Sequence, residues 1–153
     1  MKRTTIANIF AIAVGPALAL GLASTARADQ GCSNATLNGT FAYTNAGFTA
    51  PPSLAGPFAG VGTQTFDGKG ATTATAMVSQ NGNIVPVTIK GAYTVNPDCT
   101  GTLTVQISPV GLTSHAFFVI DDNGAGLRAI NTDPGTVVTT IARKQFPTGD
   151  SRQ

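Results

Sequence analysis

Apolar and polar residues alternate along eight short runs between positions 37 and 145, and each run ends at a cluster of Gly, Asn, Asp or Pro. Alternation with a period of two sends successive side chains to opposite faces of a strand, so each run predicts a β-strand. The clusters favour tight turns between strands. The predicted strands are 37–44, 58–66, 71–80, 84–95, 102–108, 114–120, 127–131 and 136–145.

This pattern predicts an all-β fold, an eight-stranded antiparallel up-and-down barrel. Eight strands are enough to close such a barrel, whose interior is either packed solid or holds one small ligand. A two-sheet β-sandwich is the alternative, because strand count alone does not separate the two architectures. The segments 117–120 and 137–138 are apolar on both faces, which indicates contact with another subunit or a place between two sheets.

The first 28 residues have the features of a secretory signal peptide. Lys2 and Arg3 precede an apolar stretch over 6–22, and Ala-Arg-Ala at 26–28 fits a cleavage site. We therefore expect bacterial-type Sec export to the periplasm or the medium, with no membrane insertion after cleavage. The expected remainder is one barrel domain over 29–145 and a flexible tail over 146–153.

Cleavage changes the charge of the protein. The chain has nine basic and seven acidic residues, and Lys2, Arg3 and Arg27 leave with the signal peptide. The remaining six basic residues nearly balance the acids, which disfavours a nucleic-acid partner. Every acidic residue is Asp, a turn residue, which agrees with a turn-rich β fold.

Cys32 and Cys99 are the two cysteines, and in an oxidising compartment they predict one structural disulfide. Successive connections of an up-and-down barrel alternate between its two ends. Counting them places both cysteines at the same end, so the topology and the disulfide agree.

The opposite end is the predicted mouth of a ligand site. It carries the 45–57 connection, which is unusually apolar for a loop facing water, together with the 109–113 loop and the start of the sixth strand. Residues of this end, together with aromatic residues of the strands, are the candidates to line a pocket for a small apolar molecule. The candidate ligand-binding residues are Phe41, Tyr43, Phe48, Leu54, Tyr93, His115 and Phe117.

Few residues offer catalytic or metal chemistry. The chain has one His and no Glu, and no His, Cys and carboxylate groups occur at metal-ligand spacing, so we expect no metal and no cofactor. Ser114 and His115 are adjacent on a strand, so their side chains point to opposite faces. They therefore cannot form the hydrogen bond by which a histidine base activates a serine nucleophile. His115 is the one candidate general base, with a solvent-facing histidine as the alternative. The acidic run at 121–124 predicts a hairpin turn rather than a calcium loop.

Three segments resemble a group of small secreted bacterial proteins: 32–41, which opens with Cys-Ser and closes with L-x-G-T-F, 65–70 with T-F-D-G-x-G, and 91–101 with G-A-Y-T-V-x-x-D-C-T-G. The opening L-x-G-T-F and the strand count also resemble the eight-stranded allene oxide cyclase-like and calycin-like barrels, which include avidins and lipocalins. The lipocalin Trp after the opening Gly is absent, and no catalytic group of a cyclase can be placed on the chain. The resemblance implies a barrel and a tendency to bind hydrophobic ligands.

Three functional hypotheses follow. The first is an exported, non-catalytic barrel that binds a small apolar molecule at the end bearing the 45–57 connection. The second is a cofactor-free cyclase or isomerase, whose chemistry can depend on shape and exclusion of water. The third is a surface or matrix protein that assembles into homo-oligomers through apolar outer strands.

Overall fold

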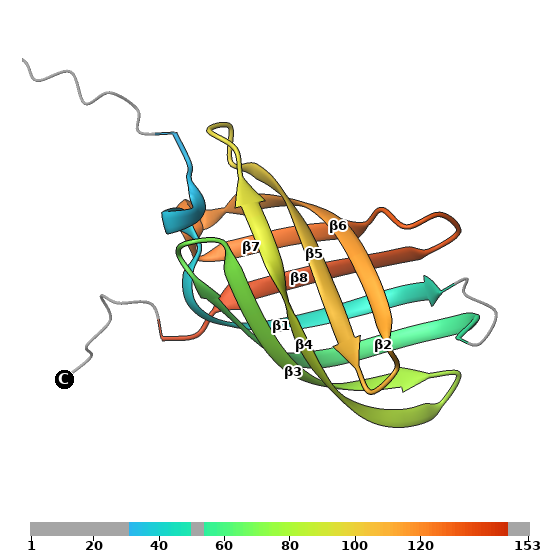
Figure 1. The fold of residues 1–153 in the computed structure, drawn as a ribbon. Coiled ribbons are helices and arrows are strands. Elements are labelled where there is room, and N and C mark those ends of the chain that lie inside the picture. The colour runs from blue at the N-terminus through green and yellow to red at the C-terminus, as the bar shows by residue number, and fades with distance from the viewer. Residues whose placement is uncertain (1–30, 50–53, 147–153) are drawn as a thin grey trace, which may run out of the picture.

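Eight antiparallel strands pair in chain order, and the last pairs with the first to close a barrel (Figure 1). The computed structural model describes residues 31–49 and 54–146. Closure confirms the predicted up-and-down barrel and excludes the sandwich. The elements are η1 (Asn34–Thr36), β1 (Asn38–Thr49), β2 (Gly56–Asp67), β3 (Ala71–Gln80), β4 (Asn83–Val95), β5 (Thr100–Ser108), β6 (Leu112–Asp121), η2 (Asp122–Gly124), β7 (Gly126–Asn131) and β8 (Val137–Lys144).

The predicted long connection over 45–57 is mostly strand, and this prediction was wrong. β1 runs on to Thr49 and β2 begins at Gly56, so Phe48 pairs with Pro57. A proline fits there because the first residues of a strand tolerate its fixed φ and missing N–H group. Residues 50–53, with the two other prolines of this segment, lie outside the described residues.

Pro86 lies in a part of β4 that has a neighbour on one side only. Its Cα partner is Met77 on β3, in an unbroken register. Pairing between β4 and β5 stops at Thr88 and Ser108, so β4 extends beyond β5. Pro86 therefore occupies an edge position within a closed barrel, because β5 is shorter than β4.

One half of the barrel interior is packed solid by aromatic side chains. Phe66 contacts Phe41 edge to face at 5.4 Å between ring centroids and Tyr93 at 5.0 Å. Phe118 fills the adjacent space over Gly101, where a Cβ atom would lie 2.2 Å from the ring. Glycine at this position lets the ring lie over its neighbouring strand, because Gly101 is the Cα partner of Phe118. These contacts close one end of the barrel to small molecules.

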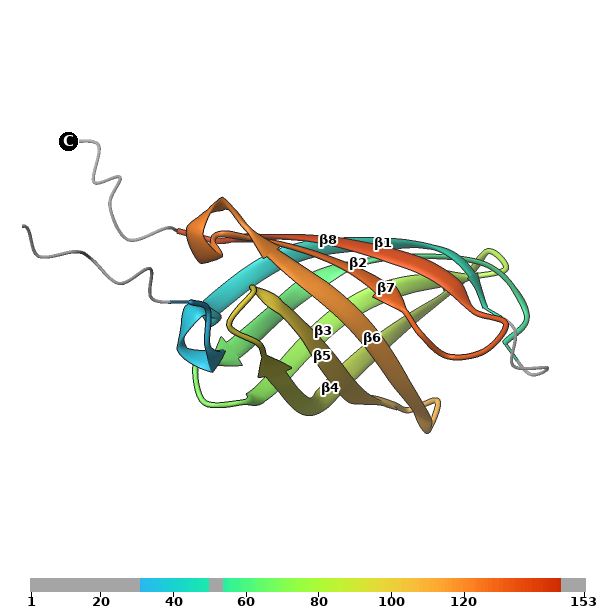
Figure 2. The ribbon, with the colours of Figure 1, turned by 90° about the horizontal axis from the view of Figure 1, so that it is seen from above.

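The disulfide and η1 cap this closed end. Cys32 and Cys99 are bonded with their Cα atoms 4.8 Å apart, and no described cysteine is free, so the predicted pairing is confirmed. Tyr93 donates its hydroxyl hydrogen bond to backbone oxygens of Leu37 (2.9 Å) and Asn34 (3.1 Å). The view from above shows η1 at the same end as the connection between β4 and β5 (Figure 2).

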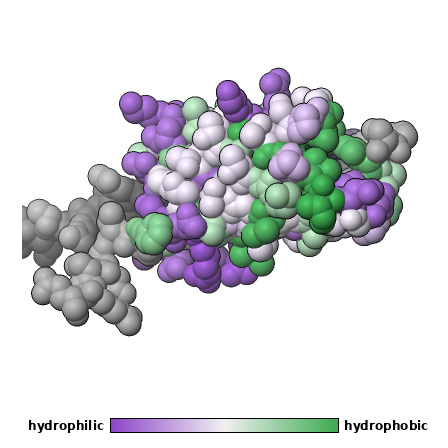
Figure 3. Space-filling model, turned by 90° about the horizontal axis from the view of Figure 1, so that it is seen from below, coloured by the Kyte–Doolittle hydropathy of each residue, from purple (hydrophilic) through white to green (hydrophobic). Residues whose placement is uncertain are grey.

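The outer wall carries many apolar side chains. Strand alternation sends Phe118, Ile120 and Val138 inward and leaves their neighbours exposed, which explains the runs that are apolar on both faces. Figure 3 shows such side chains gathered toward one end of the barrel. The outward set includes Phe48, Val61, Met77, Ile84, Phe117, Val119, Ile130, Val137 and Ile141.

The predicted signal peptide over 1–28 and all of the predicted tail except Phe146 lie outside the described residues. Within 31–49 and 54–146, no helix is long and apolar enough to cross a membrane.

The turn between β2 and β3 predicts an acid-sensitive stability. Asp67 Oδ1 accepts hydrogen bonds from the backbone N–H groups of Lys69, Ala71 and Gly70, at 2.7 to 2.9 Å, and these bonds lower the pKa of the Asp67 carboxyl. A carboxyl group whose pKa is lower in the folded state than in the unfolded state stabilises the fold. This stabilisation is fully present above the unfolded-state pKa of about 4, and it is lost as the pH falls through the folded-state pKa. We expect the melting temperature of Asp67→Asn to fall less than that of wild type between pH 5 and about pH 2. Equal falls would contradict this role.

Candidate functional site

A cavity of about 590 Å³ fills the half of the barrel that the aromatic core leaves free. It lies toward the end where the β3–β4, β5–β6 and β7–β8 connections gather and where β1 ends, at the right of Figure 1. Tyr43 and Leu127 belong to both the packed core and the cavity lining, so the core forms the cavity floor. The volume lies within the range of small-molecule sites. The cavity end of the barrel is the end opposite the Cys32–Cys99 disulfide, where the sequence predicts the mouth.

The wall formed by β4 and β5 is wholly aliphatic where it faces the cavity. Both strands alternate, so every second residue points inward, and all of these inward residues near the mouth are branched aliphatics. They offer a ligand apolar contact and no hydrogen bond. The six residues are Val85, Val87, Ile89, Leu103, Val105 and Ile107.

The wall formed by β6, β7, β8 and β1 is mixed, and it carries most of the polar groups. Asn45 of β1 pairs with Thr140 of β8, and both face the cavity. Ser114 and Asn131 face it from β6 and β7, and the Asn131 Nδ2 group donates to Ser114 Oγ at 2.7 Å. The cavity is therefore amphipathic, with one aliphatic wall and one wall that offers hydrogen bonds.

Two buried polar atoms on β1 have no hydrogen-bond partner among the described residues: the Tyr43 hydroxyl and Asn45 Oδ1. Tyr43 is only 5% exposed, and burial raises the pKa of its hydroxyl to about 12. The phenol is thus a neutral hydrogen-bond donor at physiological pH, while Asn45 Oδ1 is an acceptor. Both residues line the cavity. Unpaired buried polar atoms are costly, so two of them beside one cavity are unusual in a folded protein.

Gly60 makes the space that Asn45 occupies. The two residues are Cα partners across β1 and β2, and a Cβ atom at Gly60 would lie 2.5 Å from Asn45 Oδ1. Any other residue at position 60 would push the carboxamide away. The glycine therefore positions this polar group within the barrel.

Hydrogen bonds tie the described edge of the β1–β2 connection to the β3–β4 turn. Gln80 Nε2 donates to Leu54 O at 2.5 Å and to Thr49 Oγ1 at 3.1 Å, and Thr49 Oγ1 also donates to Leu54 O. Asn81 Nδ2 donates to Ala55 O at 2.7 Å. These bonds hold Leu54 at the rim, where it lines the cavity.

Asp133 braces the β7–β8 connection at the rim. It accepts from the backbone N–H of His115 at 2.9 Å and from Asn131 Nδ2 at 3.1 Å, and it pairs with His115 Nδ1 at 2.7 Å. Partial burial raises the pKa of Asp133, but the hydrogen bonds from His115 and Asn131 outweigh it and leave a lowered pKa. The carboxylate stays ionised and gives the rim a negative charge.

The structure divides the candidate residues into three groups. Tyr43 and Leu54 line the cavity. Phe41 and Tyr93 are buried in the core beneath it. The remaining three candidates do not line the cavity, because alternation turns them to the outer face. These are Phe48, His115, whose side chain is 51% exposed, and Phe117.

Sequence reasoning missed Asn45, Gly60 and the aliphatic wall. The aliphatic wall was visible as the alternation of 84–95 and 102–108, but alternation alone does not distinguish the wall of a cavity from packed core. A polar residue on the apolar face of the first strand, in register with a strand glycine, is the signal that would have identified Asn45.

Catalytic groups are scarce in the cavity. Among the described residues that line it, Tyr43 and Asp133 are the two with titratable side chains, and Asp133 is engaged by His115 and Asn131. Ser114 Oγ is hydrogen-bonded by Asn131, while His115 pairs with Asp133. In the described part of the chain, no group of three or more His, Cys, Asp or Glu residues could hold a metal ion.

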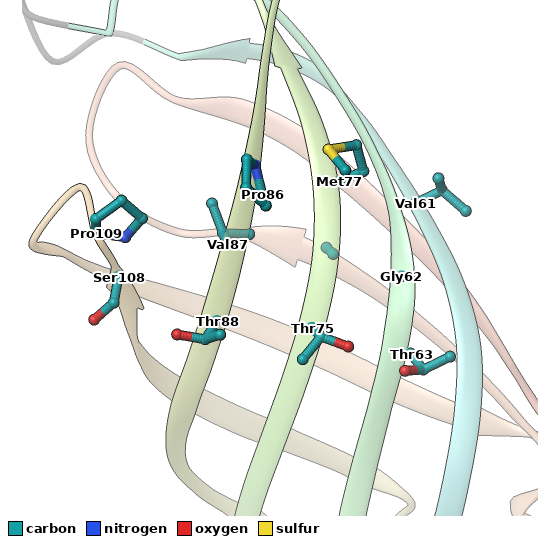
Figure 4. Close-up of a pocket in the computed structure, with 11 residues that line it drawn as sticks. Val61, Gly62, Thr63, Thr75, Met77, Pro86, Val87, Thr88, Ser108 and Pro109 are labelled. Carbon is teal, nitrogen blue, oxygen red and sulfur yellow. The ribbon is translucent and has the colours of Figure 1, made fainter.

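A shallow hollow also lies on the outer wall, over β2, β3, β4 and the end of β5. Figure 4 shows Val61, Met77 and Pro86 at one level of three neighbouring strands, which matches their register. A row of threonines lies one step further along the same strands: Thr63, Thr75 and Thr88. The polar groups of this hollow are side-chain hydroxyls on an exposed surface. The hollow therefore resembles an ordinary barrel wall more than a binding site.

No family model matches the chain, and no curated protein matches it. Among solved structures, a redesigned β barrel is similar, with a TM-score of 0.53 and 17% sequence identity over 73% of this chain and 94% of that chain. This likeness concerns the fold alone. The expected kinship with allene oxide cyclase-like and calycin-like barrels is therefore supported only as far as the barrel architecture: the chain is a small, closed β-barrel.

Proposed function

We propose that this protein is an exported β-barrel that binds one small apolar molecule inside its open half. The single observation that carries this proposal is the cavity of about 590 Å³, lined on β4 and β5 by aliphatic side chains alone. A solid barrel would fill this space with side chains. The disulfide at the closed end is compatible with an oxidising compartment outside the cytoplasm.

The proposal predicts that filling the cavity removes binding. Ala116 lines the cavity from β6 and pairs with Leu103 and Asn131. Ala116→Phe would place a ring in the space a ligand needs. We expect it to weaken binding of N-phenyl-1-naphthylamine, a neutral apolar fluorescent probe, by at least about tenfold. Fluorescence titration measures the affinity.

The matched control is Ala92→Phe, which adds the same ring to the exposed outer face of β4. It should bind the probe as wild type does. If the wild-type protein does not bind the probe, or if Ala116→Phe binds as tightly as Ala92→Phe, the interior is not the binding site.

Self-association is the second candidate function, and the exposed outer apolar side chains favour it. Phe48 pairs with Val137 across β1 and β8, and both are about half exposed or more. Apolar side chains gathered in this way often mark an interface. Analytical ultracentrifugation of the purified protein measures its oligomeric state. A multimer that dissociates in the Phe48→Ser variant supports self-association, and a monomer at all concentrations rejects it.

A further inference from the structure

We infer that the ligand is a neutral molecule with an aliphatic body and one group that both accepts and donates hydrogen bonds, a hydroxyl or a primary amide, which binds against Tyr43 and Asn45. This inference rests on the proposed function and narrows it to one chemical class.

The two unpaired polar atoms specify the polar group of the ligand. The Tyr43 hydroxyl needs an acceptor, and Asn45 Oδ1 needs a donor. Both belong to inward-facing residues two positions apart on β1. A hydroxyl or a primary amide supplies both functions from a few neighbouring atoms. A pure hydrocarbon would leave both atoms unpaired, and an ether or ester would leave Asn45 without a donor.

The charges around the cavity exclude an anionic group. No Lys or Arg is among the described residues that line the cavity, so a buried carboxylate or phosphate would find no cation there. The ionised Asp133 at the rim adds repulsion. An unpaired buried charge costs far more than a hydrogen bond returns. Fatty acids in their ionised form are thus disfavoured, whereas alcohols of the same length are not.

The opposite wall orients the rest of the molecule. The inward side chains of β4 and β5 are all aliphatic, so they solvate a hydrocarbon body without competing for its polar group. The ligand therefore lies between the aliphatic wall and β1, with its polar end toward Tyr43 and Asn45. This arrangement fixes the orientation of a ligand whose remaining atoms are all hydrocarbon.

The first test compares ligands of equal chain length. Decan-1-ol, decanamide and decanoate compete with N-phenyl-1-naphthylamine at neutral pH. We expect the alcohol and the amide to displace the probe at concentrations about tenfold or more below that of decanoate. Equal or stronger displacement by decanoate overturns the inference while leaving the proposed function intact. Failure of the probe to bind at all overturns the proposed function itself.

The second test uses the two tyrosines of the chain as a matched pair. Tyr43→Phe removes an unpaired hydroxyl, and Tyr93→Phe removes one with two hydrogen-bond partners. Without ligand, we expect Tyr43→Phe to keep or raise the melting temperature and Tyr93→Phe to lower it. Tyr43→Phe should weaken decan-1-ol binding up to about tenfold and weaken probe binding by a smaller factor.

Asn45→Leu should behave as Tyr43→Phe does, because it replaces the unpaired amide with a side chain of similar shape. If both variants destabilise the protein without changing the affinity for decan-1-ol relative to that for N-phenyl-1-naphthylamine, these residues are structural. That result would overturn the assignment.

Discussion

Opening the Cys32–Cys99 disulfide will lower the free energy of unfolding by roughly 4 kcal/mol. The bond joins residues 67 positions apart, so it removes much of the freedom of the unfolded chain. It also fixes the segment before β1 to the β4–β5 connection, where Cys32 N donates to Pro97 O at 3.0 Å. A loss of this size is a large share of the stability of a small domain.

Urea denaturation of wild type and of the Cys32→Ser, Cys99→Ser double variant measures the effect. Adding a reductant to wild type should reproduce the loss, and adding it to the double variant should change nothing. A difference below about 1 kcal/mol would show that the barrel does not depend on this bond.

Phe66→Ala will cost about 3–5 kcal/mol, comparable to the disulfide. Phe66 is 1% exposed and lies between Phe41 and Tyr93, with both ring pairs edge to face. Its removal leaves a cavity in the packed half of the barrel and loses two favourable aromatic contacts.

Phe117→Ala is the matched control for this loss. Phe117 faces outward from β6 and is 40% exposed, so we expect a cost below about 1 kcal/mol. Denaturant titration compares the two variants. If the two variants lose similar amounts of unfolding free energy, the packed half of the barrel does not contribute more to stability than the outer wall does.

The barrel could be predicted because alternation is a strong signal in a closed antiparallel sheet. Each wall residue is either inside or outside, so 71–80 and 102–108 alternate clearly, and turn residues separate the strands. The disulfide was equally accessible, since parity of the connections places both cysteines at one end. The extent of β1 was missed because the prolines after it suggested an irregular loop.

The site was predictable in position but not in detail, and the cause is strand register. Ending the first strand at 44 left Phe48 without an assigned face, and the structure continues the alternation that turns it outward. At 117 and 118 both residues are Phe, so sequence alone could not choose the inward one. Phe118 faces inward where Gly101 leaves room for its ring, a pairing between strands that only the fold reveals.

The most direct test of the account is native mass spectrometry of the protein purified without denaturation from the cells that produce it. The account predicts a reproducible added mass of roughly a few hundred daltons on wild type, the size of a molecule that fits such a cavity. The same mass should be absent from Ala116→Phe and present on Ala92→Phe. A bare wild-type mass in repeated preparations, together with no binding of N-phenyl-1-naphthylamine, would contradict the claim that the open half of the barrel holds a ligand.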